Sequence, residues 1–455
     1  MSKKIIYLLS LLMALSLVFA SCKKNSSVTG GDVPSDEPDT TPPPTDLSGG
    51  LFDTQEKLDQ YKDKPVQASQ VAKYENKNYM RNPVITVIDG QTVLIVYEVR
   101  YQTPGAGNDV ALTGTNTVDI AYMISTDAGV SFDTSAAIAG YVGGKKATGA
   151  TDSHGAPIVF YDKQNSKIVV VASAGIGLSS GTSGNGESKL EYSVADISGS
   201  TITGFGAWQP IDNIEKGSFS QFGTHSARGT VVNGKLLLPV TLVTYNTQNM
   251  NNSTFGYILY EGAAASSGTV SWTKKGSSAV TMPNGAKETR IPKGTSSSDY
   301  VALAVPAGNS KLYQGAGSSQ PTLTDIQAGD GSAGTLVVKD WKGAASYNPA
   351  DYAKTFDNNG SVQQSIVSHV LTTEANLAVR LVDTDFKSQT GNSFALGDSY
   401  ARNSKSSSID ILKDGTIVMV AEGGKVDTGV SSQTFYLFFN RYTQAYLTSK
   451  TGSAQ

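Results

Sequence analysis

Cysteine is almost absent from this chain, whose 455 residues include only Cys22. A single thiol cannot form a disulfide within the chain, so the folded part must be stabilised by an apolar core. Histidine is also scarce: His154, His225 and His369 are far apart and lack carboxylates at the spacing of a zinc site. We therefore predict no metal site.

An excess of positive charge is lacking too. The chain has 36 lysines and arginines against 39 aspartates and glutamates, a formal net charge of −3, and no basic cluster. Nucleic-acid binding has no electrostatic footprint in such a sequence, so we expect no nucleic-acid partner. The glycine-rich run Gly175–Gly177 precedes no helical pattern, so a phosphate loop is not indicated. No motif indicates a cofactor.

Long apolar runs are missing except near the N-terminus. Lys3 and Lys4 precede the apolar run Ile5–Leu17, and small residues follow before Cys22. This is the layout of a cleaved export signal, and the run is shorter than the roughly 20 residues of a transmembrane helix. Residues 1–21 are therefore predicted to be a signal peptide.

Cys22, directly after small residues, resembles the lipobox of bacterial lipoproteins. The resemblance implies that the thiol is acylated, and that the chain is an exported, membrane-anchored lipoprotein at the outer membrane or cell surface. An unpaired cysteine is unusual in an exported protein, which favours acylation over the alternative, a plain secretory signal with a free thiol. Residues 22–50, rich in proline, serine and threonine, are predicted to be a flexible, disordered linker.

Short β-rich runs dominate the rest of the chain. Residues 51–74 are a lead-in with a short helix near Asp53 to Tyr61. A unit of strand, tight turn and strand then recurs, at residues 83–97, 157–171, 229–240 and 409–420. Such recurrence favours a β-propeller, whose blades bury their faces only against one another. We predict an all-β, six-bladed β-propeller over residues 75–447.

One turn carries a motif. Residues 125–132 fit the pattern S-x-D-x-G-x-[ST]-[WF], with Ser125, Asp127, Gly129 and Phe132 at its defining positions. Asp127 can accept hydrogen bonds from turn amides, Gly129 can take a positive φ, and Phe132 can pack beneath the blade. This pattern is the Asp-box, or BNR repeat, of sialidases, where it shapes a turn and does no chemistry.

Other segments resemble sialidases (neuraminidases) as well. Arg81-Asn82-Pro83, with the strand that ends at Arg100, resembles their opening blade. Asn376–Leu381 resembles their N-L-T-V-R-L strand, and Ser407–Ile417 resembles their last blade. The resemblance covers about residues 75 to 445. It implies an exo-α-sialidase-like, retaining glycoside hydrolase that acts on extracellular sialoglycans.

The resemblance implies a binding pair and a set of catalytic residues. Arg81 falls at the first of three arginines that clamp the substrate carboxylate, and Glu422 at the glutamate that orients it. Tyr400 is the expected nucleophile and Glu288 its activator. Asp109 is the expected acid/base.

Two of these assignments have competitors. Asp119 is closer to the Asp-box than Asp109, but it aligns with a strand position that usually points elsewhere. An alignment taken backwards from Asp414-Gly415 puts Ser406 where the tyrosine belongs, so the identity of the nucleophile stays open.

The clamp departs from the family pattern. The strand Tyr300–Pro306 lacks the second arginine, and Glu374 stands in place of the third, where its charge would repel a carboxylate. Arg290, Arg402 and Arg228 are available to rebuild a clamp. Two alternatives therefore stay open: a non-catalytic glycan-binding or adhesion surface lipoprotein, and a hydrolase of another sugar. In each case the partners are sialylated or other glycans.

Overall fold

The computed structural model describes seventeen stretches of the chain, and for residues 292–405 it describes the backbone alone. The described residues are 50–52, 54–72, 78–101, 117–132, 140–179, 186–249, 252–282, 286–294, 300–306, 311–314, 322–325, 337–342, 364–372, 375–383, 389–395, 406–426 and 433–451. They all belong to one compact unit, Ser35–Gln455. Cys22, Asp109, Tyr400 and Arg402 lie outside them.

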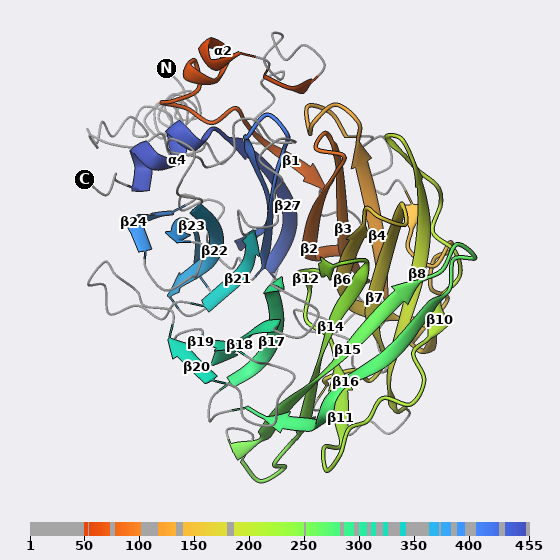
Figure 1. The fold of residues 1–455 in the computed structure, drawn as a ribbon. Coiled ribbons are helices and arrows are strands. Elements are labelled where there is room, and N and C mark those ends of the chain that lie inside the picture. Colours follow the sequence, from red (N-terminus) through yellow and green to blue (C-terminus); the bar gives the residue numbers. More distant parts are fainter. Residues whose placement is uncertain are drawn as a thin grey trace, which may run out of the picture. The chain divides into compact units, whose positions relative to one another are not determined.

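The described chain is almost entirely β, as predicted, and its strands form six sheets (Figure 1). Sheet 1 contains β2 (Asn78–Ile88), β3 (Thr92–Tyr101), β4 (Val118–Ser125) and β5 (Gly140–Tyr141). Sheet 2 contains β6 (His154–Asp162), β7 (Lys167–Gly175), β8 (Ser188–Ser198), β9 (Thr201–Ile202), β10 (Gln209–Pro210) and β12 (Ala227–Arg228). Sheet 3 contains β11 (Gln221–Gly223), β13 (Thr230–Val232), β14 (Lys235–Thr244), β15 (Thr254–Ala264) and β16 (Val270–Thr281).

The C-terminal half supplies three further sheets. Sheet 4 contains β17 (Ala286–Gly294), β18 (Tyr300–Pro306), β19 (Lys311–Gln314) and β20 (Thr322–Asp325). Sheet 5 contains β21 (Val337–Lys342), β22 (Gln364–Thr372), β23 (Ala375–Asp383) and β24 (Gln389–Ala395). Sheet 6 contains β25 (Ser407–Ile411), β26 (Ile417–Val426), β27 (Gln433–Tyr442) and β1 (Gln67–Ala72). The helical segments described are α2 (Gln55–Asp59), η2 (Ala150–Asp152) and α4 (Gln444–Thr451).

The four predicted hairpins are confirmed as β2–β3, β6–β7, β13–β14 and β25–β26. Their turns place small or polar residues at positive φ, for example Asp89 (50°) followed by Gly90 (75°) and Asn233 (50°) followed by Gly234 (70°). The two-residue turn between β13 and β14, with both residues at positive φ, matches the twist of the strands that it joins, whereas three residues, 89–91, connect β2 and β3. The predicted short helix near Asp53 to Tyr61 is confirmed as α2.

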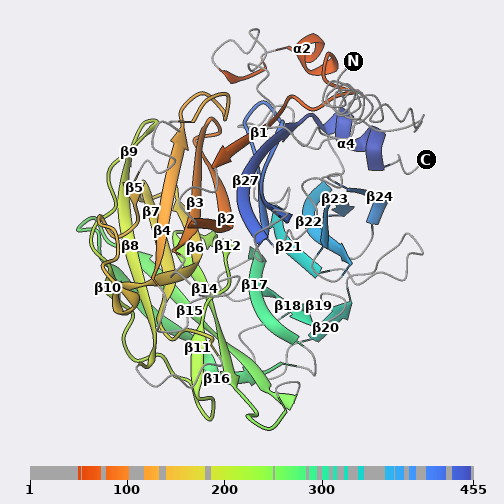
Figure 2. The ribbon, with the colours of Figure 1, turned by 180° about the vertical axis from the view of Figure 1, so that it is seen from behind.

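The sheets follow one another in a closed series of contacts. β2 contacts β6, β6 contacts β13, β13 contacts β17, β17 contacts β21, β21 contacts β25, and β25 contacts β2 again. Figure 2 shows two of these neighbours, β2 beside β6 and β17 beside β21. Apolar side chains fill the space between sheets 1 and 2, where Val84 and Leu94 of sheet 1 pack with Val159 and Val170 of sheet 2. Because central strands are buried on both faces, runs such as Thr92–Tyr101 read as continuous apolar stretches rather than alternating ones.

Sheet 6 combines both ends of the described chain. β1 pairs with β27, with Gln67 opposite Arg441. This strand precedes residue 75, the predicted start of the propeller, and the sequence had not predicted it. Because β1 covers the outer edge of the last sheet, that edge is not left with unpaired backbone groups.

Register defines two ends of sheets 1 and 6. At one end Arg81 is opposite Glu98 and Arg100 is opposite Val118, and at the other Ile88 is opposite Thr92 and Val93 is opposite Ser125. The seven steps along β2 from Arg81 to Ile88 span about 23 Å at ~3.3 Å per step. We call the end with Arg81, Glu98 and Glu422 the site end. The other end, with the turns at Gly90 and Asp414, is the latch end; there Lys413 N–H donates to Gly90 O.

Candidate functional site

Arg81 and Glu422 form a buried, two-point ion pair between sheets 1 and 6. The Arg81 Nε lies 2.8 Å from Glu422 Oε2, and Nη2 lies 3.2 Å from Oε1. The side chains are 4% and 0% exposed. A paired guanidinium and carboxylate fix each other's position and orientation, and burial makes the loss of either partner costly. The structure thus brings together the two residues predicted as a clamp arginine and its orienting glutamate, although their roles are not tested by this contact.

Arg81 sits at a bulge, which explains how one strand reaches two glutamates. Between Arg81 and Val84, β2 has one residue more than β3, and the sequence there is Arg81-Asn82-Pro83. Proline donates no ladder hydrogen bond and is tolerated in a bulge. Asn82 takes a φ of 50°, and its N–H donates to Glu422 Oε2 at 3.0 Å.

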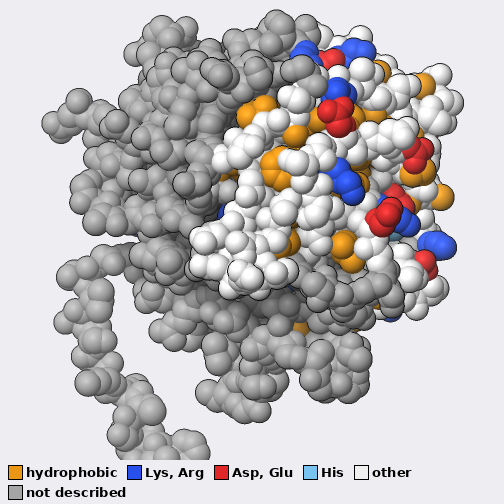
Figure 3. All heavy atoms as spheres, turned by 90° about the horizontal axis from the view of Figure 1, so that it is seen from below, with side chains coloured by type: hydrophobic (Ala, Val, Ile, Leu, Met, Phe, Trp, Pro, Cys, Tyr) orange, Lys and Arg blue, Asp and Glu red, His pale blue; other side chains and the backbone are white. Residues whose placement is uncertain are grey.

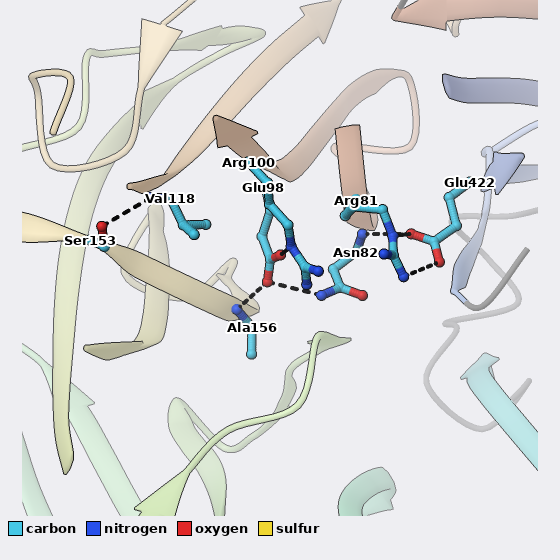
Figure 4. A network of polar contacts seen from close by, with 8 residues as sticks. All are labelled: Arg81, Asn82, Glu98, Arg100, Val118, Ser153, Ala156 and Glu422. Carbon is cyan, nitrogen blue, oxygen red and sulfur yellow. Dashed lines mark hydrogen bonds and ion pairs between the residues drawn. The ribbon is translucent and has the colours of Figure 1, made fainter. Parts of the chain in front are cut away.

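Glu98 lies at the centre of the site end and was not assigned a role from the sequence. It is 2% exposed, and it accepts hydrogen bonds from Asn82 Nδ2 at 2.9 Å, Ala156 N at 2.6 Å and Arg100 Nε at 2.6 Å (Figure 4). Burial by itself raises the pKa of the Glu98 carboxyl, but the Arg100 charge and these hydrogen bonds hold the pKa below its usual value. Glu98 is therefore a buried, ionised acceptor joining three elements.

Asp119, the competitor of Asp109, also lies at the site end. It is opposite Val99 in the β3–β4 pair and 5% exposed. Ala147 N donates to its Oδ1 at 2.6 Å, whereas its buried Oδ2 has no hydrogen-bond partner among the described residues. Burial raises the pKa of the Asp119 carboxyl. A buried carboxyl with a raised pKa is a feature of acid/base groups, but ion networks also produce it.

Glu288 and Arg290 pair with each other on β17. Arg290 Nη1 lies 2.5 Å from Glu288 Oε2, and the side chains are 10% and 26% exposed respectively. This pair lies on a strand of sheet 4, whereas Arg81 and Glu422 lie on sheets 1 and 6. The next residue, Ile291, accepts a hydrogen bond from Thr230 of β13, which ties β17 to sheet 3. Arg228, the other available arginine, donates from Nε to Ile409 O at 3.0 Å.

A histidine contact beside the site end was missed by the sequence reasoning. His154, two residues before Ala156, contacts Glu191 Oε2 through Nε2 at 2.8 Å. Its ring stacks on Trp208 with centroids 4.1 Å apart and planes 7° apart. The hydrogen bond from His154 lowers the pKa of Glu191. No sequence signal identifies this contact, because Glu191 is 37 residues away on another strand.

The predicted motif turn lies at the latch end. Ser125 Oγ donates to Asp127 Oδ1 at 2.6 Å, Gly129 N donates to Ser125 Oγ at 2.8 Å, and Ser131 N donates to Asp127 Oδ1 at 2.9 Å. Gly129 has a φ of 86°, and the Phe132 ring packs edge-on against Phe439 at 5.1 Å. The turn is thus built by its own side chains, far from Arg81.

Neither sign of charge forms a patch on the coloured part of the face seen in Figure 3. Basic and acidic side chains lie singly or next to each other on the coloured part of this face, with no broad area of one sign. Among the described residues, no group of histidine, cysteine, aspartate or glutamate is arranged to hold a metal ion. No described helix is long and apolar enough to cross a membrane.

Comparison with known proteins shows similarity in fold. No protein-family profile and no curated protein matches the chain. A sialidase from Trypanosoma rangeli has a TM-score of 0.54 and 12% identity, over 82% of this chain and 55% of that chain. The Hadza microbial sialidase Hz136 has a TM-score of 0.56 and 13% identity, over 84% of this chain and 69% of that chain.

A third solved structure has no function assigned to it. This protein, from Dyadobacter fermentans, has a TM-score of 0.55 and 10% identity, over 83% of this chain and 98% of that chain. The match with the Trypanosoma enzyme, in contrast, covers little more than half of that enzyme's length. At these identities the fold is sialidase-like, and activity does not follow from it.

Proposed function

We propose that the six sheets are the blades of a sialidase-like β-propeller and that the turn at residues 125–132 is an Asp-box. The closed series of contacts from β2 through β25 and back to β2 supports the propeller, because only a ring of sheets returns from the last sheet to the first. The solved structures of similar fold include sialidases, which supports the same architecture. The hydrogen bonds of Ser125 and Asp127 support the Asp-box.

At the site end the protein acts as an exo-α-sialidase-like, retaining glycoside hydrolase on extracellular sialoglycans. The observation that carries this proposal is the buried pair of Arg81 and Glu422, since a guanidinium held rigidly by a carboxylate is suited to bind the carboxylate of an acidic sugar. Acidic glycans are therefore the proposed substrates.

Each step of the reaction has a proposed residue. Asp109 protonates the leaving oxygen, while Tyr400, activated by Glu288, attacks the anomeric carbon and forms a covalent glycosyl-enzyme. Water then releases the sugar, with Asp109 acting as base. Arg81 holds the carboxylate throughout, and Arg290 and Arg402 are candidates for further contacts to it.

Turnover of a fluorogenic sialoside by the mature chain tests the proposal. We expect activity that falls by at least ~100-fold in Tyr400→Phe, because the variant lacks the nucleophilic oxygen. Arg81→Lys keeps the charge but not the two-point geometry, so we expect a higher KM. Undiminished turnover in Tyr400→Phe would remove that residue from the mechanism, and no turnover by the unaltered chain would exclude hydrolysis of this substrate.

The pairing of Glu288 favours a second candidate, a glycan-binding surface protein that does not cleave. Glu288 pairs with the Arg290 guanidinium, and a carboxylate stabilised by a positive charge is a weaker base for activating a tyrosine. Binding of a sialylated trisaccharide, measured by calorimetry, with no release of sialic acid would support this candidate. Release of a neutral sugar instead would point to a hydrolase of another glycan.

The linker that follows the proposed lipid anchor at Cys22 joins the fold at the latch end. Gly50, where the linker ends, is held at the latch end by Arg441, so the linker joins the fold opposite Arg81. Cys22→Ala should move the protein from the membrane fraction to the soluble exported fraction. Retention in the membrane fraction would count against lipidation.

A further inference from the structure

Glu98 joins three parts of the site end that are separate in the sequence. Its Oε1 accepts from Asn82 in the bulge of β2 and from Ala156 in the bulge of β6, and its Oε2 accepts from Arg100 on its own strand. Ala156 has a φ of 52°, close to the 50° of Asn82. Both bulges thus turn a donor toward the same carboxylate, which fits a fixed position for each.

Asn82 connects this carboxylate to the Arg81 pair. Its backbone N–H donates to Glu422 Oε2 and its side-chain amide donates to Glu98 Oε1. The result is a row from Glu422 through Arg81 and Asn82 to Glu98 and Arg100, in which negative and positive groups alternate (Figure 4). Any shift of Glu98 moves Asn82, and Asn82 is bonded in the chain to Arg81.

The next sheet contains the same arrangement without a charge. Glu98 is opposite Arg81, the residue before Asn82; likewise Ser173 is opposite Gly155, the residue before Ala156. As Glu98 accepts from Ala156 N of the following sheet, Ser173 Oγ accepts from Thr224 N at 2.8 Å. A neutral serine is therefore sufficient to link neighbouring elements at the equivalent strand position.

Linking two sheets therefore does not explain why the residue at the position of Glu98 is charged. We propose that Glu98 is a positioning residue for the ligand site, which holds Arg81 in place through Asn82. Resting on the proposed function, this inference predicts that Glu98 contributes to the recognition of an acidic sugar without touching it. The buried, ionised carboxylate is suited to this because charged acceptors hold their donors more strongly than a hydroxyl does.

Chemical modification of Arg81 tests the inference without any ligand. Arg81 is 3% exposed, so the mature chain should react slowly at this residue with phenylglyoxal, an arginine-directed reagent. In Glu98→Gln the modification rate of Arg81, followed by peptide mass spectrometry, should rise at least ~10-fold, because a neutral amide holds Asn82 less strongly. Ser173→Ala is the matched control, and there the rate at Arg81 should not change.

Asn82→Gly is a milder variant in case Glu98→Gln fails to fold. Glycine accepts the positive φ and keeps the N–H to Glu422, but lacks the bond to Glu98. We expect faster modification of Arg81 here as well. An unchanged rate in a folded Glu98→Gln or Asn82→Gly chain overturns the inference.

Binding of 3′-sialyllactose against lactose then separates this inference from the proposed function. In Glu98→Gln we expect affinity for the acidic sugar to fall about 10- to 100-fold with little change for lactose, whereas Ser173→Ala should change neither. Unchanged acidic-sugar affinity in Glu98→Gln overturns the ligand part of the inference. If the unaltered chain binds no acidic sugar yet Arg81 becomes reactive in Glu98→Gln, the proposed function fails and the positioning of Arg81 by Glu98 stands.

Discussion

The two ends of sheets 1 and 6 each contain a buried arginine paired with a carboxylate, but the two pairs have different surroundings. At the latch end Arg441 is 0% exposed and donates to Thr416 Oγ1, Gly50 O and Asp414 Oδ2 at 2.6–2.8 Å. Asp414 Oδ2 also accepts from Phe52 N, and its Oδ1 accepts from Thr416. These contacts join the beginning of the described chain to its last sheet.

At the site end, not every buried polar atom has a hydrogen-bond partner among the described residues. Arg81 pairs with Glu422 and Arg100 with Glu98, yet the buried Oδ2 of Asp119 has no partner among the described residues. Non-glycine residues hold positive φ at both ends, Asn82 and Ala156 at the site end and Asp89 and Ala128 at the latch end, so this backbone strain does not distinguish them. The two ends differ instead in their polar contacts: the Arg441–Asp414 pair is surrounded by hydrogen-bond partners, whereas a buried carboxylate oxygen at the site end has none among the described residues.

The largest expected effect tests the ion pair between Arg441 and Asp414 at the latch end. Asp414→Ala leaves the Arg441 guanidinium buried without its carboxylate, so we expect the free energy of unfolding to fall by about 3–5 kcal/mol. Urea denaturation measures this. Lys413→Ala, at the exposed neighbouring position, is the control and should change it by less than ~0.5 kcal/mol. A loss below ~1 kcal/mol for Asp414→Ala would mean that the ion pair with Arg441 contributes little to the free energy of unfolding.

Glu98→Gln should produce the next largest loss of stability, about 1–3 kcal/mol at pH 7, because three donors lose a charged acceptor. The folded pKa of Glu98 lies below its usual value, so its contribution is present above the unfolded pKa, about 4.3, and is lost as the pH falls toward the folded pKa. Thermal unfolding of the variant should therefore depend less on pH below about 4.3 than that of the unaltered chain. If the melting temperatures of the variant and of the unaltered chain fall equally as the pH is lowered, Glu98 is not the titrating group.

Asp127→Ala removes the acceptor of the motif turn at the latch end. Ser125 and Ser131 lose their partner, and we expect a loss of about 1–2 kcal/mol in the free energy of unfolding. Because the turn lies at the latch end, whereas Arg81 lies at the site end, affinity for acidic sugars should stay the same. A change in affinity would show that the two ends are coupled.

Asp119→Asn should have the smallest effect and the opposite sign. Burial raises the pKa of Asp119, so ionising it at neutral pH opposes folding, and this cost is absent below the unfolded pKa and present above the folded pKa. The asparagine Oδ1 can still accept from Ala147 N. We expect a small rise in the melting temperature at pH 7 that disappears at acid pH, measured by scanning calorimetry. A fall at pH 7 would mean that the carboxylate is stabilised in the folded chain.

Sequence patterns predicted the strands well because the signals are local. The Asp89-Gly90 and Asn233-Gly234 turns lie between apolar runs, and each turn selects its hairpin without help from distant residues. The strand β1 was missed because its residues, Gln67–Ala72, carry no strong apolar run and form a strand by pairing with β27. Pairing with a distant strand leaves little trace in local composition.

The candidate site was predictable only where a family resemblance supplied the partner. Arg81 and Glu422 are 341 residues apart, and no spacing rule joins them. Glu98 was visible in the motif that ends at Arg100, but its contact with Ala156 depends on how sheet 2 lies against sheet 1. Glu288 was predicted to activate Tyr400; its observed contact is with Arg290, and the activation stays a prediction because Tyr400 lies outside the described residues.

The sequence by itself determined the β class, the hairpin turns and the turn at Ser125–Phe132, since the hydrogen bonds of that turn join residues two to four positions apart. Only the tertiary structure decided that Asn82 bridges two glutamates and that Arg441 reaches Gly50, 391 residues away. The physical reason is that these contacts form only when the first and last sheets meet. Their geometry depends on that meeting, and no stretch of a few residues encodes it.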